Sequence, residues 1–223
     1  GRIVPTRPPA AIPPFGSPLS NLVPVPLLEP DVKLPLPGAE DDIVVGGGGR
    51  FLLLAMKALQ KVGVFDVREG KLLKYVNVES DQFFVAGGAT QFVIADALGE
   101  SLEAWSYDKL DQPRLRTTIT SPDEKKLRGA VMGFSSQGPL GCSFDYPKYG
   151  PQQCFVELFD LETLTPHKYV VNWNGKHSFS ARELSAARLA ATPDSRTFLI
   201  SEGINVNTLK LDAAGSLATL QPE

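Results

Sequence analysis

A short strand-and-turn pattern returns four times along this chain, and it constrains the fold more than any other feature. In each copy an apolar segment ends in a hydrophobic, a polar and an apolar residue, and a polar turn follows. The copies lie 40, 54 and 50 residues apart, close to the ~40–50 residues of repeats built from four short strands. A unit of this size cannot bury both faces of its own sheet, so it must stack on copies of itself. The four copies are Phe65-Asp66-Val67, Trp105-Ser106-Tyr107, Phe159-Asp160-Leu161 and Leu209-Lys210-Leu211.

The segments around these copies predict an all-β chain, a β-propeller-like array of about four four-stranded antiparallel blades. Phe51 to Met56 is wholly apolar, which predicts a strand buried on both faces. Residues 168–172 are the expected outer strand of the third blade. Residues 182–191 also fit a helix, because Ala and Leu favour one, but the repeat needs a strand there. The propeller region spans residues 32–223, with repeats at about 41–79, 81–120, 127–173 and 183–223.

Residues 1–31 differ from the rest of the chain because they are rich in proline. Each proline lacks an amide donor and constrains the residue before it. This segment predicts a disordered linker, with a ligand for a proline-recognising domain as the alternative. Because a linker needs a second domain and the sequence begins at Gly1, we expect the chain to be part of a longer protein. Residues 32–36 alternate and predict an edge strand, where proline is tolerated.

Charge and hydropathy indicate whether the chain binds nucleic acid or spans a membrane. The net charge is −3 and the pI about 5.5, whereas a nucleic-acid surface needs clustered Lys and Arg. The basic stretch 125–128 follows Asp123 and Glu124 and predicts a solvated loop. No apolar run approaches the roughly 20 residues of a membrane-spanning helix. We therefore expect no nucleic acid and no membrane span within this chain, and the compartment, cytoplasmic or exported, stays open.

Several of these motifs resemble bacterial WD40-like repeats, also described as YVTN-type β-propellers. Phe65-Asp66 and Phe159-Asp160 stand in the place of the Trp-Asp pair of that family, and residues 192–196 (Thr-Pro-Asp-Ser-Arg) resemble its Ser-Pro-Asp-Gly-Arg turn. The glycine-containing stretches 47–50 and 87–90 stand at the equivalent turn. The resemblance covers residues 32–223. Members have six to eight blades, so the four visible here predict either a truncated arc or a four-bladed ring.

The resemblance implies a non-catalytic scaffold that binds a protein or another ligand within a larger protein. The alternative is a propeller enzyme, of the lactone hydrolase or quinone-dependent dehydrogenase type. The repeated Asp66 and Asp160 are expected to hold turns rather than to catalyse proton transfer, because a catalytic acid has no reason to recur at a repeat position. We therefore expect no catalytic residue and no cofactor.

The best candidate contact site is the insertion 145–153 in the third repeat. Its Tyr146, Lys148 and Tyr149 are held by prolines, and tyrosine brings contact area at little entropic cost. The alternative is a loop that packs on its own blade. Turns expected on the same rim of the propeller add Lys57, Asp96 and Glu202.

The sequence gives little support for a metal site or a phosphate-binding loop. His167 and His177 are the only histidines, and a metal site needs more convergent ligands. The glycines 46–49 are not followed by the Lys and the Ser or Thr of a phosphate loop and predict a tight turn. Cys142 and Cys154 flank the insertion. They predict either a disulfide between neighbouring strands or two reduced thiols.

Overall fold

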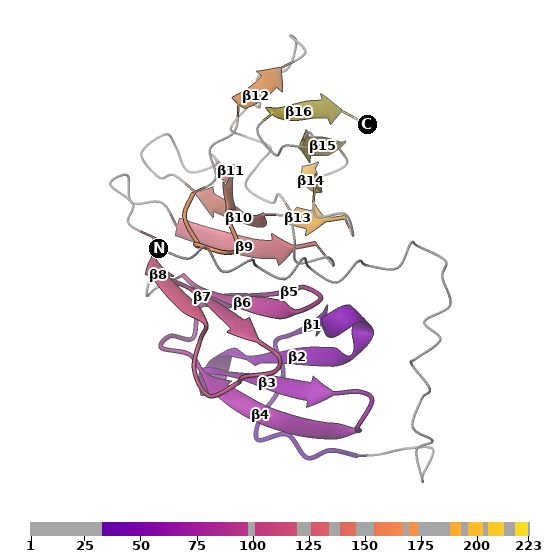
Figure 1. The fold of residues 1–223 in the computed structure, drawn as a ribbon, viewed down its shortest axis with the longest axis vertical. Helices are drawn as coiled ribbons and strands as arrows, with labels where there is room; N and C mark the ends of the chain where they lie inside the picture. Colours follow the sequence, from indigo (N-terminus) through magenta and orange to yellow (C-terminus); the bar gives the residue numbers. More distant parts are fainter. Residues whose placement is uncertain are drawn as a thin grey trace, which may run out of the picture.

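The computed structural model describes residues 33–97, 101–119, 126–133, 139–145, 154–166, 170–173, 188–192, 196–202, 205–211 and 217–222. These residues form sixteen β-strands in four sheets, with two short 3-10 helices (Figure 1). The predicted all-β fold of four blades is confirmed. The predicted linker, residues 1–31, lies outside the described residues, and residues 33–36 form no strand, in contrast to the expected edge strand.

The first two blades are four-stranded antiparallel sheets in sequence order. Three glycines with positive φ, between 59° and 90°, form η1 (Gly47–Gly49) and turn the chain from β1 into β2, because glycine enters this region without steric cost. At the opposite end η2 (Lys57–Leu59) turns β2 into β3. The first blade contains β1 (Asp42–Gly46), β2 (Phe51–Met56), β3 (Lys61–Asp66) and β4 (Lys71–Asn77). The second contains β5 (Phe83–Gly87), β6 (Gln91–Asp96), β7 (Ser101–Ser106) and β8 (Leu115–Thr118).

The third and fourth sheets depart from a strict four-strand repeat. Within the described ranges, the third contains three strands, β9 (Lys126–Met132), β10 (Leu140–Asp145) and β11 (Cys154–Phe159). The fourth contains β13 (Arg188–Ala191), β14 (Thr197–Glu202), β15 (Asn205–Leu211) and β16 (Leu217–Pro222). The expected outer strand of the third blade, β12 (Val170–Trp173), instead pairs with β16. This pairing is parallel, so the prediction of residues 168–172 as the outer strand of the third blade is corrected.

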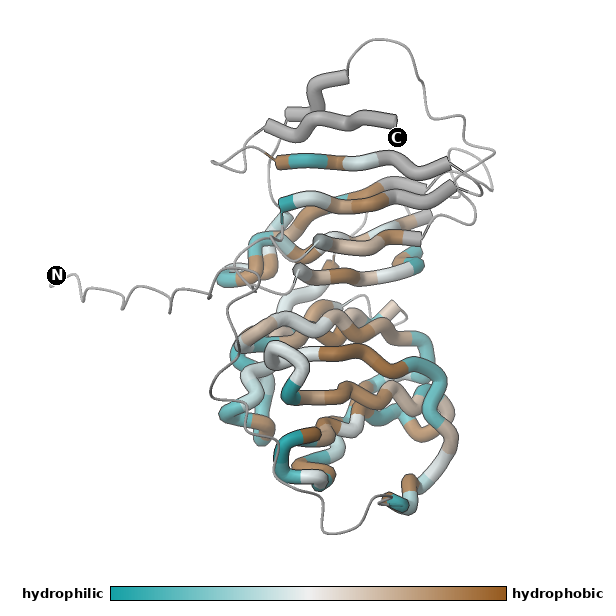
Figure 2. Tube along the Cα trace, turned by 90° about the vertical axis from the view of Figure 1, so that its right-hand side faces the viewer, coloured by the Kyte–Doolittle hydropathy of each residue, from teal (hydrophilic) through white to brown (hydrophobic). Residues whose placement is uncertain are grey.

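The four blades follow one another along an open arc, with the first and fourth at opposite ends (Figure 1). Hydrophobic residues run along the strands, and hydrophilic residues gather in many of the turns (Figure 2). Separate apolar clusters lie between the first and second blades, the second and third, and the third and fourth. The core is therefore made of sheet faces packed on each other, as expected for blades that cannot bury their faces alone.

The contact between the first two blades is close enough to require glycine. A Cβ built at Gly87 would lie 2.5 Å from the carbonyl oxygen of Val45 in the neighbouring blade. Backbone atoms cannot rotate out of the way as a side chain can. Gly129 is a useful comparison, because its Cβ would meet only the Ser143 hydroxyl, at 3.0 Å.

We therefore expect Gly87→Ala to destabilise the fold much more than Gly129→Ala. Overpacking of this kind costs about 1–3 kcal/mol, and Gly129→Ala should cost less than about 1 kcal/mol because the Ser143 side chain can move. Chemical denaturation followed by tryptophan fluorescence measures both values. Equal losses for the two variants would contradict the close packing between the blades.

Candidate functional site

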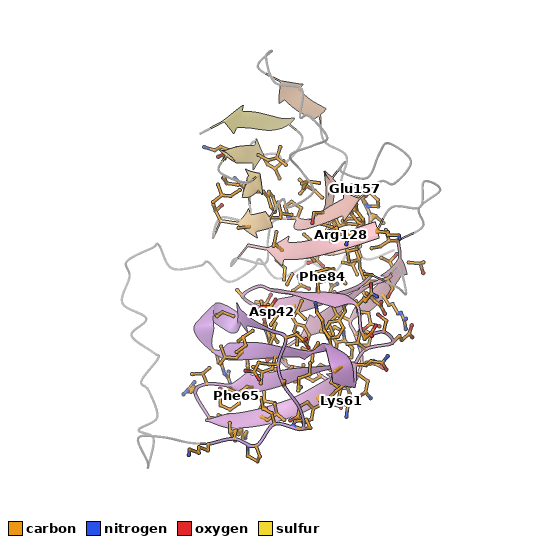
Figure 3. All side chains as sticks on the ribbon, turned by 180° about the vertical axis from the view of Figure 1, so that it is seen from behind. Asp42, Lys61, Phe65, Phe84, Arg128 and Glu157 are labelled. Atoms are coloured by element: carbon orange, nitrogen blue, oxygen red, sulfur yellow. The ribbon has the colours of Figure 1, made fainter. Side chains whose placement is uncertain are left out.

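The candidate contact site lies at the end of the sheets where β2 turns into β3. Lys61 and Phe65 mark the two ends of β3 in Figure 3, and the site lies at the Lys61 end. Backbone hydrogen bonds hold the connections here: the Asp41 amide donates to Ala55, Val78 to Gln60, and Ala97 to Gln82. The chain before β1, the η2 turn and the β4–β5 connection therefore share one rim, which we call the η2 rim.

Lys57, a predicted contact residue, lies on η2 and is half-buried. Its ammonium lies 5.1 Å from the ring centroid of Phe84, which belongs to β5 of the second blade (Figure 3). Its amide donates to the Asp41 carboxylate at 2.6 Å. A cation over an aromatic face contributes about 0.5–1 kcal/mol at a partly exposed site. Lys57 therefore links the two blades at the rim.

Asp96, a second predicted contact residue, ends β6 and is only 3% exposed. Its carboxylate accepts a hydrogen bond from the Ser80 hydroxyl, which also contacts the backbone of Gln82. This predicted contact residue is thus buried instead of exposed on the rim. The reason is that Asp96 fastens the β4–β5 connection to the end of β6 instead of extending into solvent.

The structure describes little of the remaining predicted contact residues. Tyr146, Lys148 and Tyr149 lie outside the described residues. Glu202 ends β14, where its backbone faces Asn205 in the register of β14 and β15. The structure thus brings Lys57 and Asp96 to one rim, and the role of the insertion 145–153 stays a prediction.

The η2 rim also carries a set of exposed residues that the sequence analysis missed. Leu59 is 37% exposed on η2, and exposed acidic residues lie in the chain before β1 and in the β4–β5 connection of the same rim. Glu79 is paired with Arg116 at 2.6 Å and is therefore partly neutralised. Only the backbone register shows that these acids share one rim, because they come from two separate connections, the chain before β1 and the β4–β5 connection. The exposed acids of the rim are Glu40, Asp41, Asp42 and Asp81.

At the opposite end of the sheets, one polar residue in each of the first three blades holds the turn after the third strand. The Asp66 carboxylate accepts from the amides of Arg68 and Glu69 at 2.9 and 3.1 Å. The Asp160 carboxylate accepts from Glu162 and Thr163, both at 2.9 Å. The hydroxyl of Ser106 accepts from Asp108 at 3.3 Å in the second blade. Asp66 and Asp160 therefore serve turns, as their repetition predicted.

In the first blade this turn carries an ion pair as well. Arg50 donates to the fully buried carboxylate of Asp66 at 2.9 and 2.7 Å. Burial raises the pKa of Asp66, but the hydrogen bonds from Arg50, Glu69 and Arg68 outweigh it, so the net pKa lies below the ordinary value. The same hydrogen bond raises the pKa of Arg50. Asp66 is therefore ionised at neutral pH and is bound by Arg50.

The described residues hold no group of three or more His, Cys, Asp or Glu placed to bind a metal ion. His167 and His177 lie outside them. Among these residues, no helix is long and apolar enough to span a membrane. The register pairs Cys142 with Glu157, and Cys154 with Asp145. The two cysteines are thus three positions apart along neighbouring strands, about 10 Å, beyond disulfide reach, so this register favours two thiols.

Comparison with known proteins confirms the fold. No protein-family model and no curated protein matches the sequence. Among solved structures, hydrazine synthase from Kuenenia stuttgartiensis matches 88% of this chain and 52% of its own, with a TM-score of 0.56 and 15% identity. The Swd1 β-propeller domain from Myceliophteria thermophila matches 81% of this chain and 54% of its own, with a TM-score of 0.54 and 13% identity.

A functionally unknown protein from Desulfotomaculum acetoxidans matches 84% of this chain and 56% of its own, with a TM-score of 0.57 and 13% identity. The fold is that of a β-propeller. The chain spans about half the length of these structures. At such low identity the likeness establishes the fold alone.

The Arg50–Asp66 pair predicts a pH-dependent stability. A carboxylate with a lowered folded pKa stabilises the fold above its unfolded pKa of about 3.9, and this contribution is lost as the pH falls through the folded value. We expect Asp66→Asn to lower the free energy of unfolding by at most about 2 kcal/mol at pH 7. Solvent screening weakens the ion pair, because Arg50 is partly exposed. The difference from wild type should shrink below about pH 4.

Asp160→Asn is the matched control, because Asn keeps an oxygen for the two turn amides and no arginine is bonded to Asp160 in the described contacts. It should cost less than about 1 kcal/mol. Thermal melts of the three proteins between about pH 3 and 8 give the comparison. A pH-independent difference for Asp66→Asn would contradict the ion pair as its source.

Proposed function

We propose that this β-propeller is a non-catalytic scaffold that binds a protein partner through the η2 rim. The observation that carries the proposal is that the exposed Leu59 shares one rim with the exposed Glu40, Asp41, Asp42 and Asp81. An apolar anchor in a polar, charged rim is the usual anatomy of a protein interface. The acidic surroundings favour a segment that carries Lys or Arg together with an apolar residue.

The rigidity of the rim supports the proposal. The Lys57 amide bonds to the Asp41 carboxylate, and the Lys57 ammonium lies on Phe84 of the next blade. Ser80 is hydrogen-bonded to the buried Asp96. These contacts fix three connections relative to one another. A surface that is ordered before binding loses little conformational entropy when a partner arrives.

The geometry favours this surface over the opposite end of the sheets. There the polar side chains of Asp66, Ser106 and Asp160 are occupied by the amides of their own turns. Arg114 is likewise occupied, since it donates to Gln91 in its own blade and to the Leu161 carbonyl in the next. These polar groups at that end are bonded within and between the blades, whereas Glu40 and Asp81 on the η2 rim are exposed.

A peptide-display selection against the full chain, followed by fluorescence anisotropy with the selected peptides, tests this function. We expect the peptides to be enriched in Lys and Arg with one apolar residue. The double variant Glu40→Lys/Asp81→Lys should weaken their binding at least about tenfold, and salt should weaken binding to the wild type. Neither residue makes a structural contact described above, so both substitutions should leave the fold intact.

Asp108→Lys is the control, because Asp108 is also an exposed acid and lies at the opposite end of the sheets. It should bind the peptides as the wild type does. Selected peptides that bind the double variant undiminished would place the binding surface elsewhere. In that case the insertion with Tyr146, Lys148 and Tyr149 is the next candidate, and alanine substitutions there decide it.

A further inference from the structure

The exposed apolar side chains of this protein are concentrated on the first blade. Among the side chains that the structure describes, every large hydrophobic one that is exposed belongs to this blade or to the chain before it. The first blade therefore has an apolar surface that the rest of the described chain leaves uncovered. These side chains are Leu34, Ile43, Val45, Leu59, Val67 and Leu73, with exposed fractions between 36% and 54%.

Strand alternation places Ile43 and Val45 on the outer face of the first blade, the face turned away from the second blade. Val44, which lies between them, packs against the apolar cluster that the first two blades share, and successive side chains in a strand point to opposite faces. Val45 faces Leu52 in the next strand, and Leu52 faces Phe65. The latter two are half-buried. The outer face therefore carries a continuous apolar row across β1, β2 and β3.

Val67 extends this row at the end of β3. It comes two positions after Phe65, and its amide donates to the carbonyl of Arg50 at 2.8 Å, so the pairing of β2 with β3 continues to this residue. Ile43, Val45 and Val67 are 50%, 54% and 45% exposed. The uncovered row is thus made of Ile43, Val45, Leu52, Phe65 and Val67.

Another part of the outer face is already covered. By the same alternation Leu54 and Met56 lie on this face, yet Leu54 is only 7% exposed and Met56 is fully buried. Residues 33–41 form no strand and cross this side of the blade on their way to β1 (Figure 3). Their Gly38 lies so close to η2 that a Cβ there would be 2.8 Å from Cδ1 of Leu59. An irregular segment of this chain can therefore lie on the outer face without joining the sheet.

The residues that can extend this cover come directly before it in the sequence. In Figures 1 and 3 the chain before β1 starts beside the end of the first blade at which β3 turns into β4. Val67 follows β3 at this same end. Eight extended residues span about 25 Å, and the three strands of the row lie about 5 Å apart. The segment immediately before residue 33 is therefore long enough to reach the whole row.

Residues 22–28 have the composition that this surface requires. They read Leu-Val-Pro-Val-Pro-Leu-Leu, and no charged residue occurs between positions 8 and 28. Segments that stay disordered in water are instead poor in hydrophobic residues and rich in charge. Proline has no amide to donate to a sheet, so this segment is suited to contact a sheet face through its side chains. The segment and the uncovered row are both apolar and uncharged.

We propose that residues 22–28, within the segment expected to be a linker, pack on the uncovered row and cap the outer face of the first blade. The cap continues the cover that residues 33–41 provide on the same face. Its driving force is the removal of apolar surface on both partners from water. This inference concerns the outer face and is independent of the binding proposed at the η2 rim.

Photo-crosslinking in the full chain tests the contact directly. Val67→p-benzoylphenylalanine places a photoreactive group in the uncovered row, and mass spectrometry after irradiation identifies the peptide that it attaches to. We expect attachment to residues 22–28 within a monomer. Asp108→p-benzoylphenylalanine is the control, because Asp108 is exposed on the second blade and should not attach to these residues.

Two double variants show which side chains make the contact. Val25→Ser/Leu27→Ser removes two apolar side chains from residues 22–28 and should abolish the cross-link from position 67. Ala11→Ser/Ile12→Ser changes the same N-terminal segment outside the proposed cap and should retain the cross-link.

Thermal stability gives an independent readout. Val45→Thr exchanges a methyl group for a hydroxyl, which costs little in water and more beneath an apolar cover. In the full chain it should lower the melting temperature by about 2–4 °C. In the Val25→Ser/Leu27→Ser chain it should leave the melting temperature nearly unchanged, because two residues in contact do not act additively. Circular dichroism shows that each variant folds.

Three results would overturn the proposal. One is cross-linking from position 67 that does not reach residues 22–28, or that reaches them no better than cross-linking from position 108. Another is a cross-linked dimer, which would make a second copy of the chain the occupant of the outer face. The third is an effect of Val45→Thr that is the same with and without the serine substitutions.

Discussion

The packing of one sheet face on the next is the interaction on which this structure depends. Among the residues that the structure describes, no blade has a core of its own, since the apolar clusters lie between blades. The contact between the first two shows how close the approach is: Tyr107 stacks on Phe51 with ring centroids 4.4 Å apart, and its hydroxyl donates to the Gly88 carbonyl at 3.1 Å. Burial raises the pKa of Tyr107, which keeps the hydroxyl protonated. Glycine at position 46 leaves room for the Tyr107 hydroxyl, and glycine at position 87 leaves room for the Val45 carbonyl.

This dependence explains why the polar chemistry of the chain is mostly structural. Arg50 and Asp66 hold a turn, Arg114 joins the second and third blades, and Lys57 joins the first and second. Lys74 reaches Asp111 in the same way. Groups that in isolation suggest acid–base chemistry or ligand binding are thus used to orient sheets. The surface left for partners is set by the connections, and this is why the proposed site lies on a rim.

The sequence predicted the strands well because each blade follows a local pattern. Phe51 to Met56 forms a strand as expected, and the glycines before Phe51 form a turn. The outer strand of the third blade was misplaced, since strand propensity does not select a partner, and β12 pairs with β16 instead of β11. Asp96, a predicted contact residue, is buried, because the Ser80 hydroxyl that binds it comes from another connection.

The sequence by itself determined the class of fold, the position of most strands and the structural role of Asp66 and Asp160. These follow from the alternation of side chains along a strand and from a repeat that recurs every few dozen residues, both of which are local. Only the tertiary structure decided that the four blades lie along an arc, that Leu59 shares a rim with exposed acids from two connections, and that Ile43, Val45 and Val67 stay exposed. These depend on which sheets and connections meet in space, and contacts between distant segments leave no periodic signal in the sequence.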